Sequence, residues 1–350
     1  MKLSEAGARI AVVGASSLLG KELLSLLEES PFPVSRIITV EDESGDPGLP
    51  ILDLREGSHE GVGEAGIHPD ELDLIFVSSL SKRAPKFLGP RVAEGALAGS
   101  ERARPAVIDL TGGLSSAGNE LLRVPFLERG RVSSAISPPL QEARLIASPH
   151  SAAIVLSALL LRTARRFQIE SAVAQVFAPA SELGPLAIEE LQNQAVSLLG
   201  FKEIPQAIFG GQLAFNLLPR FSGERAGVME LLEHRVRKEL ERYFRGRAVL
   251  PALRVFPAPI FYSLALSLYL EMREPCDPQA LASALAGKPV EVRKPSGRSP
   301  SSMDAAGTDG ILVDTVTADP SRPTGLWIWA TADNLRLAAR NAIAIAEDLS

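Results

Sequence analysis

The first third of the chain alternates short apolar runs with a stretch of helical spacing. Residues 9–13 are mostly apolar and end in a glycine-containing turn, leucines recur at 19, 23, 24, 26 and 27, and a second apolar run follows at 37–40. This order of strand, turn, helix and strand indicates a βαβ unit. Apolar runs at 74–78 and 106–110, with a helical pattern at 85–98 between them, predict a parallel, doubly wound sheet in an α/β domain over residues 1–130.

The pattern changes after residue 130. A helix is predicted over 152–167, because alanine, leucine and valine dominate this stretch and arginines follow near its C-terminal end. The other predicted elements are strands at 171–178, 252–258 and 261–272 and helices at 186–199, 228–244 and 334–348. This order indicates a second, α+β domain over 131–330, in which the polar stretch 290–309, rich in Ser, Pro and Gly, predicts a mobile loop.

Composition narrows the classes of function. The chain has 350 residues, of which 46% are hydrophobic and 22% charged, and its net charge of −6 lacks the basic excess that binds nucleic acid or an anionic membrane. Residues 1–7 lead directly into a strand pattern and leave no room for a signal peptide, which predicts a cytoplasmic protein. The uncharged run 255–270 is too short for a membrane helix and contains Pro257 and Pro259.

The cysteine and histidine content excludes two further kinds of site. Cys276 is the only cysteine, so no intrachain disulfide can form. The four histidines are scattered and give no spacing typical of metal ligands, so no metal is expected.

Three segments carry a resemblance to a known family. They are 12–20 (Val-Val-Gly-Ala-Ser-Ser-Leu-Leu-Gly), 147–154 (Ala-Ser-Pro-His-Ser-Ala-Ala-Ile) and 333–342 (Asp-Asn-Leu-Arg-Leu-Ala-Ala-Arg-Asn-Ala). Together they resemble the aspartate-semialdehyde dehydrogenase family along nearly the whole chain. The resemblance implies a Rossmann-like NAD(P)-binding domain, an α+β catalytic and dimerisation domain whose large sheet forms a homodimer interface, and a C-terminal helix within 331–350 that packs back onto the first domain. The sister family of N-acetyl-glutamyl-phosphate reductases is the second choice.

The predicted nucleotide-binding turn consists of Gly14, Ala15, Ser16, Ser17, Leu18, Leu19 and Gly20. It keeps the first and last glycines of a dinucleotide turn, but Ser17 stands where the family has the glycine that lets the pyrophosphate approach the backbone. Because a glycine pair between a strand and a helix is by itself only a tight turn, the absence of any cofactor stays an alternative.

Two further positions bear on the choice of nucleotide. Glu41, Asp42 and Glu43 would repel a 2′-phosphate, which predicts NAD rather than NADP. By resemblance, Asn341 matches an asparagine that contacts the nicotinamide amide.

The resemblance also implies the catalytic positions. The nucleophilic cysteine of the family aligns with Ser151, and the asparagine before it aligns with His150. The family's glutamine, a substrate-binding arginine and the proton-moving histidine align with Ala178, Pro257 and Leu264, and Ser115 stands at a further arginine. The side chains that perform the family's chemistry are therefore replaced, and Arg220, Arg225, Arg235 and Arg254 are alternative donors for the substrate's anionic groups.

Several functions stay open from the sequence. Ser151 acts either as a nucleophile with His150 as its base or as a helix cap through its side-chain oxygen. The leading hypothesis is a family member with weak or no family activity that binds NAD or a partner protein. The alternatives are an active NAD-dependent oxidoreductase for a different small aldehyde or alcohol, and a structural or regulatory dimer subunit that associates with an active paralogue.

Overall fold

The computed structural model describes residues 7–40, 71–80, 105–114, 120–129, 145–222, 226–294 and 297–349. The predicted helix at 85–98 lies outside the described residues, as do Glu41, Asp42, Glu43, Ser115 and Arg225.

The chain forms two compact units. The first comprises Met1–His150 together with Ala338–Ser350, and the second comprises Ser151–Leu337. The domain limits expected near residues 130 and 331 stay a prediction, because a boundary between compact units is not the same property as a boundary between functional domains.

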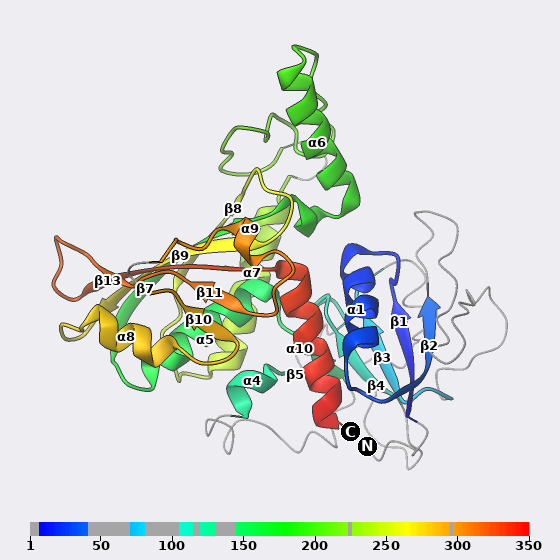
Figure 1. Ribbon diagram of the computed structural model, residues 1–350, viewed down its shortest axis with the longest axis horizontal. Helices are drawn as coiled ribbons and strands as arrows, with labels where there is room; N and C mark the ends of the chain where they lie inside the picture. The colour runs from blue at the N-terminus through cyan, green and yellow to red at the C-terminus, as the bar shows by residue number, and fades with distance from the viewer. Residues whose placement is uncertain are drawn as a thin grey trace. The chain divides into compact units, whose positions relative to one another are not determined.

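The first unit contains a six-stranded sheet in the order β2-β1-β3-β4-β6-β5, in which every pair is parallel (Figure 1). Its strands are β1 (Ala8–Val13), β2 (Val34–Val40), β3 (Leu74–Val77), β4 (Ala106–Asp109), β5 (Leu121–Leu122) and β6 (Leu145–Ala147). All residues of β3 and β4 are buried, as expected of strands that are covered on both faces. The expected parallel α/β sheet is confirmed. Its order reverses between β1 and β3, where α/β proteins bind ligands beyond the carboxyl ends of the strands.

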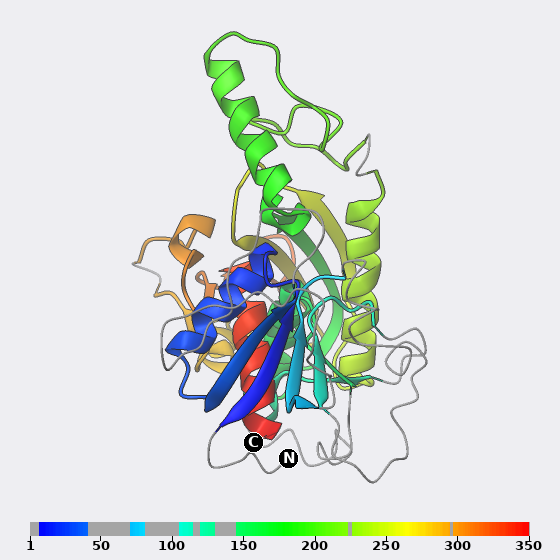
Figure 2. The ribbon, with the colours of Figure 1, turned by 90° about the vertical axis from the view of Figure 1, so that its right-hand side faces the viewer.

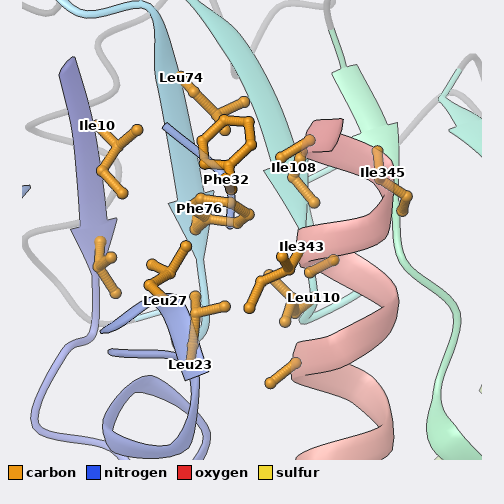
Figure 3. Close-up of a cluster of buried hydrophobic side chains, with 14 of the residues drawn as sticks. Ile10, Leu23, Leu27, Phe32, Leu74, Phe76, Ile108, Leu110, Ile343 and Ile345 are labelled. Atoms are coloured by element: carbon orange, nitrogen blue, oxygen red, sulfur yellow. The ribbon is translucent and has the colours of Figure 1, made fainter. Parts of the chain in front are cut away.

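One face of this sheet packs against two helices from opposite ends of the chain. These are α1 (Leu18–Glu29) and the C-terminal part of α10 (Asn334–Leu349), which lie side by side along the sheet (Figures 1 and 2). Leu23 and Leu27 of α1 and Ile343 of α10 meet Phe76 and Ile108 of the strands in one buried cluster (Figure 3). The expectation that the final helix packs back onto the first domain is confirmed. The other described helix of this unit is the short α4 (Pro125–Glu128).

The second unit is built on a seven-stranded mixed sheet in the order β10-β11-β13-β9-β7-β8, with β12 paired to β13. Its strands are β7 (Ile169–Ala178), β8 (Ala252–Pro257), β9 (Leu264–Met272), β10 (Val290–Val292), β11 (Ile311–Val313), β12 (Thr317–Ala318) and β13 (Gly325–Ala332). Its helices are α5 (Ser151–Ala164), α6 (Pro185–Leu199), α7 (Val228–Phe244), α8 (Pro278–Leu285) and α9 (Ser302–Ala305), with a 3₁₀ helix η4 (Ala180–Leu183) before α6.

Burial alternates along the long strands of this sheet. In β7 and β9 every second side chain is buried, which gives the sheet one covered and one open face. The helix α5 packs against α7, α8, β7 and β13, and all but one of its residues are buried. The expected α+β architecture of the second domain is therefore confirmed.

The loop predicted over 290–309 is wrong in part. Residues Val290–Val292 form β10, which pairs in parallel with β11 about twenty positions along the chain. Residues Ser302–Ala305 form α9, whose start is fixed by a capping box in which the Ser301 hydroxyl and the Asp304 carboxylate each accept a backbone amide. The predicted strand at 261–272 begins only at Leu264.

None of the helices in the described part of the chain is both long enough and apolar enough to cross a membrane.

Candidate functional site

The glycine-containing turn of the first unit joins β1 to α1 at the carboxyl end of β1. Gly14 has φ +78°, and a Cβ on it would lie 2.5 Å from Ser79 Cβ. A Cβ on Gly20 would lie 2.3 Å from the carbonyl oxygen of Gly14, so the first turn of α1 packs directly on the turn backbone. Both glycines are therefore required, one for a tight turn and one for close packing of helix on strand.

Ser17 is the N-cap of α1. Its backbone is extended, with φ −65° and ψ 158°, and its hydroxyl oxygen accepts the amide of Gly20 at 3.0 Å. The same hydroxyl lies 3.3 Å from the Ser78 hydroxyl, which in turn lies 2.9 Å from the carbonyl oxygens of Val13 and Gly14. Ser17, at the middle position of the turn, is therefore fixed by hydrogen bonds of its own side chain.

Asn341 lies on α10 inside the first unit and is 4% exposed. Its side-chain nitrogen donates to the carbonyl oxygen of Arg123 at 3.0 Å and to the Ser148 hydroxyl at 2.9 Å. Its side-chain oxygen is buried and has no hydrogen-bond partner within the described residues. A buried amide oxygen in this state can accept a hydrogen bond from an N–H of a ligand.

Ser151 is the first residue of α5 and is 2% exposed, while His150, which precedes it, is partly exposed. The position in front of the helix, from which a side chain normally caps the first turn, thus belongs to His150.

Three apolar residues lie at one edge of the second sheet. Ala178 ends β7 and pairs with Pro257 at the end of the parallel strand β8. Leu264 begins β9, which runs antiparallel to β7 and pairs Phe177 with Ala265 beside it. Ala178 is 3% exposed and Leu264 is 1% exposed, and Pro257 is also buried. This edge offers no ionisable side chain at the three positions.

A buried amide joins the segments around this edge. Asn334, at the start of α10, accepts the backbone amide of Ser263 at 3.1 Å through its oxygen. Its nitrogen donates to the Ser181 hydroxyl at 3.1 Å and to the Glu182 carboxylate at 2.9 Å. Asn334 thus fixes η4, which follows Ala178, to the residue before Leu264. Sequence reasoning missed this network, because its members are more than seventy positions apart.

Comparison with known proteins identifies the family. Residues 161–337, just over half of the chain, match the family described as "Semialdehyde dehydrogenase, dimerisation domain". The chain belongs to the semialdehyde dehydrogenase family.

Full-length relatives agree with this assignment. A USG-1 protein homolog of Pseudomonas aeruginosa is 28% identical over 344 residues, which cover 97% of this chain and 96% of the relative. Aspartate-semialdehyde dehydrogenase of Rickettsia conorii is 25% identical and covers 97% of each chain. Among solved structures, a probable aspartate-semialdehyde dehydrogenase from P. aeruginosa has a TM-score of 0.78 at 26% identity, with 98% of both chains covered.

A more distant structure supports the fold alone. The crystal structure of aspartate semialdehyde dehydrogenase II from Vibrio cholerae has a TM-score of 0.79 at 23% identity and covers 98% of both chains.

The structure of this semialdehyde dehydrogenase family member brings together the positions that the resemblance had singled out. Ala178, Pro257 and Leu264, expected to stand where relatives carry a glutamine, an arginine and a histidine, lie at the same sheet edge. The Asn334 network holds the backbone around them. The side chains at these three positions are apolar.

The alternative arginines are engaged elsewhere. Arg235 forms an ion pair with Glu239 at 2.8 Å on α7. Arg254 lies 3.6 Å from Glu233 and its side chain is 66% exposed. Because Arg254 and Pro257 are three positions apart in one strand, their side chains point to opposite faces of the sheet. Arg220 is exposed. Arg235 and Arg254 thus have acidic partners on α7, and Arg254 points away from the face of Pro257.

Cys276 lies in the connection between β9 and α8, well away in sequence from α5. Burial, and then the neighbouring carboxylate of Asp277, raise the pKa of its thiol above the ordinary value. A raised pKa lowers the thiolate fraction at neutral pH. The surroundings of this cysteine therefore make its thiol a poorer nucleophile. Within the described residues, no group of three His, Cys, Asp or Glu side chains could hold a metal ion.

Proposed function

We propose that this protein is a semialdehyde dehydrogenase family member that has lost the family's phosphate-dependent oxidation of an aldehyde and keeps the scaffold, nucleotide binding and self-association. The observation that carries the proposal is the sheet edge at which Ala178, Pro257 and Leu264 are all buried and apolar. All three positions lie together, and two of the alternative arginines, Arg235 and Arg254, pair with glutamates of α7.

The serine at position 151 is a second argument against the family's chemistry, because a serine hydroxyl is a weaker nucleophile than a cysteine thiol. A cysteine thiol, with an ordinary pKa of about 8.5, ionises in part at neutral pH and is activated further at a helix N-terminus. A serine hydroxyl at the same place does not ionise and needs a partner base. His150 adjoins Ser151 in sequence, but neighbouring residues at a helix start usually point apart. An ester formed on serine would also accept hydride less readily than a thioester.

The binding of an anionic substrate is weakened as well. Hydrogen bonds to charged groups contribute about 1.5–3 kcal/mol each, and Pro257 stands where the resemblance implies an arginine. A carboxylate or phosphate at this edge would therefore lose a principal partner. Glu182, whose carboxylate belongs to the Asn334 network, adds a negative charge nearby.

Nucleotide binding is proposed from the first unit. Gly14 and Gly20 build the turn, and the free oxygen of Asn341 suits the amide N–H of a nicotinamide. When bound, the nicotinamide would supply the hydride acceptor of the family's chemistry. One solved relative, from Candida albicans, is described as aspartate semialdehyde dehydrogenase with NADP. For this chain NAD is proposed, because of the acidic stretch that begins at Glu41, and tighter binding of NADPH than of NADH would contradict that preference.

Self-association is proposed through the open face of the second sheet, which lies in the part matched by the dimerisation-domain family. Val173 and Trp327 on this face are each 42% exposed, and Phe177 stacks on Phe256 and contacts Trp329. An exposed aromatic patch of this kind is typical of a protein interface. A cytoplasmic homodimer is proposed. Mixed dimers with an active paralogue are the regulatory alternative, and co-purification of homodimers alone from the native cell would count against them.

The experiment is a rate measurement with aspartate semialdehyde, phosphate and either NAD⁺ or NADP⁺, with an active relative as positive control. We expect no reduction of nucleotide above the blank, and robust phosphate-dependent turnover would overturn the proposal. A screen of small uncharged aldehydes and alcohols follows for the alternative function, an oxidoreductase with a different substrate. In that case Ser151→Ala should abolish any rate found if Ser151 takes part, and an unchanged rate would remove Ser151 from the site.

A further inference from the structure

We infer that Ser17 limits how tightly the first unit binds a dinucleotide, because its side chain occupies the turn position and the helix amide that a pyrophosphate would use. This inference rests on the nucleotide binding in the proposed function and concerns affinity, not catalysis.

The backbone at Ser17 does not require glycine. Its φ of −65° and ψ of 158° are open to any residue, unlike those of Gly14 at φ +78°. The middle glycine of a dinucleotide turn therefore serves the ligand, whose pyrophosphate must come close to the backbone, and not the fold of the turn. A serine here leaves the turn intact and adds a Cβ and a hydroxyl on the path of approach.

The hydroxyl of Ser17 makes hydrogen bonds to two groups of the protein. Ser78 is 8% exposed and its single hydroxyl proton points to the carbonyl oxygens of Val13 and Gly14, both at 2.9 Å. In the 3.3 Å contact between the two serines, Ser17 must therefore donate and Ser78 accept. One of the two lone pairs of the Ser17 oxygen accepts the Gly20 amide at 3.0 Å. The Ser17 hydroxyl is thus fixed in place and is not a free donor for a phosphate oxygen.

The backbone amides at the start of α1 are also partly engaged within the protein. Of the first amides of α1, that of Ser17 donates to the Gly14 carbonyl at 3.0 Å and that of Gly20 to the Ser17 hydroxyl. Within the described residues no hydrogen bond pairs the amides of Leu18 and Leu19, so a phosphate that also takes the third amide, that of Gly20, has to displace the second of these bonds. Binding therefore competes with a cap that the free protein already has.

The test measures NADH dissociation constants of the full chain and its Ser17→Gly variant by nicotinamide fluorescence. We expect Ser17→Gly to bind NADH at least tenfold more tightly, equal to about 1.4 kcal/mol. Ser17→Ala, which frees the amide but keeps the Cβ, should lie between the two, and Ser17→Thr, which keeps the cap, should bind no more tightly than the natural protein. Thermal unfolding shows whether each variant is folded.

Adenosine, which has the base and ribose but no phosphate, is the control ligand. Its affinity, measured by calorimetry, should change less than twofold in Ser17→Gly. Equal tightening for adenosine and NADH, or NADH binding within twofold of the natural protein, would overturn the role of Ser17. In the latter case measurable binding by the natural protein would leave the proposed nucleotide binding intact, whereas no binding by either protein would reject both.

Discussion

At the scale of single residues, Ser263 is fully buried and has two features that destabilise the folded state. Its φ of 68° is a left-handed conformation that is unfavourable for any residue with a Cβ, and its hydroxyl has no hydrogen-bond partner within the described residues. We predict that Ser263→Gly raises the free energy of unfolding by about 1–2 kcal/mol, because relief of both costs exceeds the extra chain entropy of glycine. Urea denaturation measures the change.

Ser263→Ala is the matched control, because it removes the hydroxyl and keeps the strained Cβ. It should be stabilised less than Ser263→Gly. A glycine variant less stable than the natural protein would show that the hydroxyl has a partner that the folded chain requires.

The reactivity of the Cys276 thiol should depend on pH. Burial and Asp277 raise the pKa of its thiol, so the thiolate fraction is small at neutral pH and grows only as pH rises through and above the ordinary value of about 8.5. We expect iodoacetamide to modify Cys276 more slowly than it modifies a small free thiol at pH 7, with a rate still rising above pH 9. Intact mass follows the reaction, and complete, rapid labelling at pH 7 would contradict the assignment.

At the scale of elements, two buried polar side chains of α6 hold the following loop. Gln194 is fully buried, and its amide donates to the carbonyl oxygens of Pro205 and Gly211 and accepts the amides of Leu213 and Ala214, all within 2.8–3.0 Å. The Glu190 carboxylate accepts the amides of the adjoining loop residues 208 and 209. The loop has no regular secondary structure, so these side chains supply the hydrogen bonds that its backbone groups need.

We predict that Gln194→Leu lowers the free energy of unfolding by about 2–4 kcal/mol, because it removes the partner of four backbone groups, of which the amides of Leu213 and Ala214 are buried. Amide hydrogen exchange should rise within residues 205–214 specifically. The control is Gln192→Leu, an equal substitution at an exposed position of the same helix, which should change neither quantity by much. Equal effects of the two substitutions would mean that the amide network does not hold the loop.

The long helices were predictable from periodicity, whereas α8 and the strands β11, β12 and β13 were not predicted. The helices α6, α7 and α10 begin and end within a residue or so of the predicted limits, because each has a clear apolar face and a clear stop. The short strand β10 was not predicted, since three residues carry no periodicity and the strand exists only through pairing with β11. The same limit applies to the site: the resemblance supplied Ala178, Pro257 and Leu264, but the Asn334 network and the pair Ser17–Ser78 depend on contacts between distant positions.

At the scale of the whole molecule, the proposed self-association through the open face of the second sheet predicts the oligomeric state. We expect a mass of twice 37.3 kDa by light scattering at micromolar concentration. Trp327→Arg, which places a charge within the exposed aromatic patch, should shift the protein toward monomer, because burying an unpaired cation at an interface is unfavourable.

Ser283→Arg on the exposed side of α8 is the control for added charge, and it should leave the mass unchanged. A natural protein that is monomeric at this concentration, or a Trp327→Arg variant that remains fully dimeric, would contradict an interface on this face.

We propose that the chain keeps the scaffold of the semialdehyde dehydrogenase family without its covalent chemistry. The most direct measurement is intact mass after incubation with aspartate semialdehyde and either NAD⁺ or NADP⁺ in the absence of phosphate, where an acyl-enzyme accumulates if one forms. An active relative provides the positive control. The account predicts no acyl adduct on this protein. A stoichiometric adduct that maps to Ser151 and disappears when phosphate is added would contradict it and make Ser151 a working nucleophile.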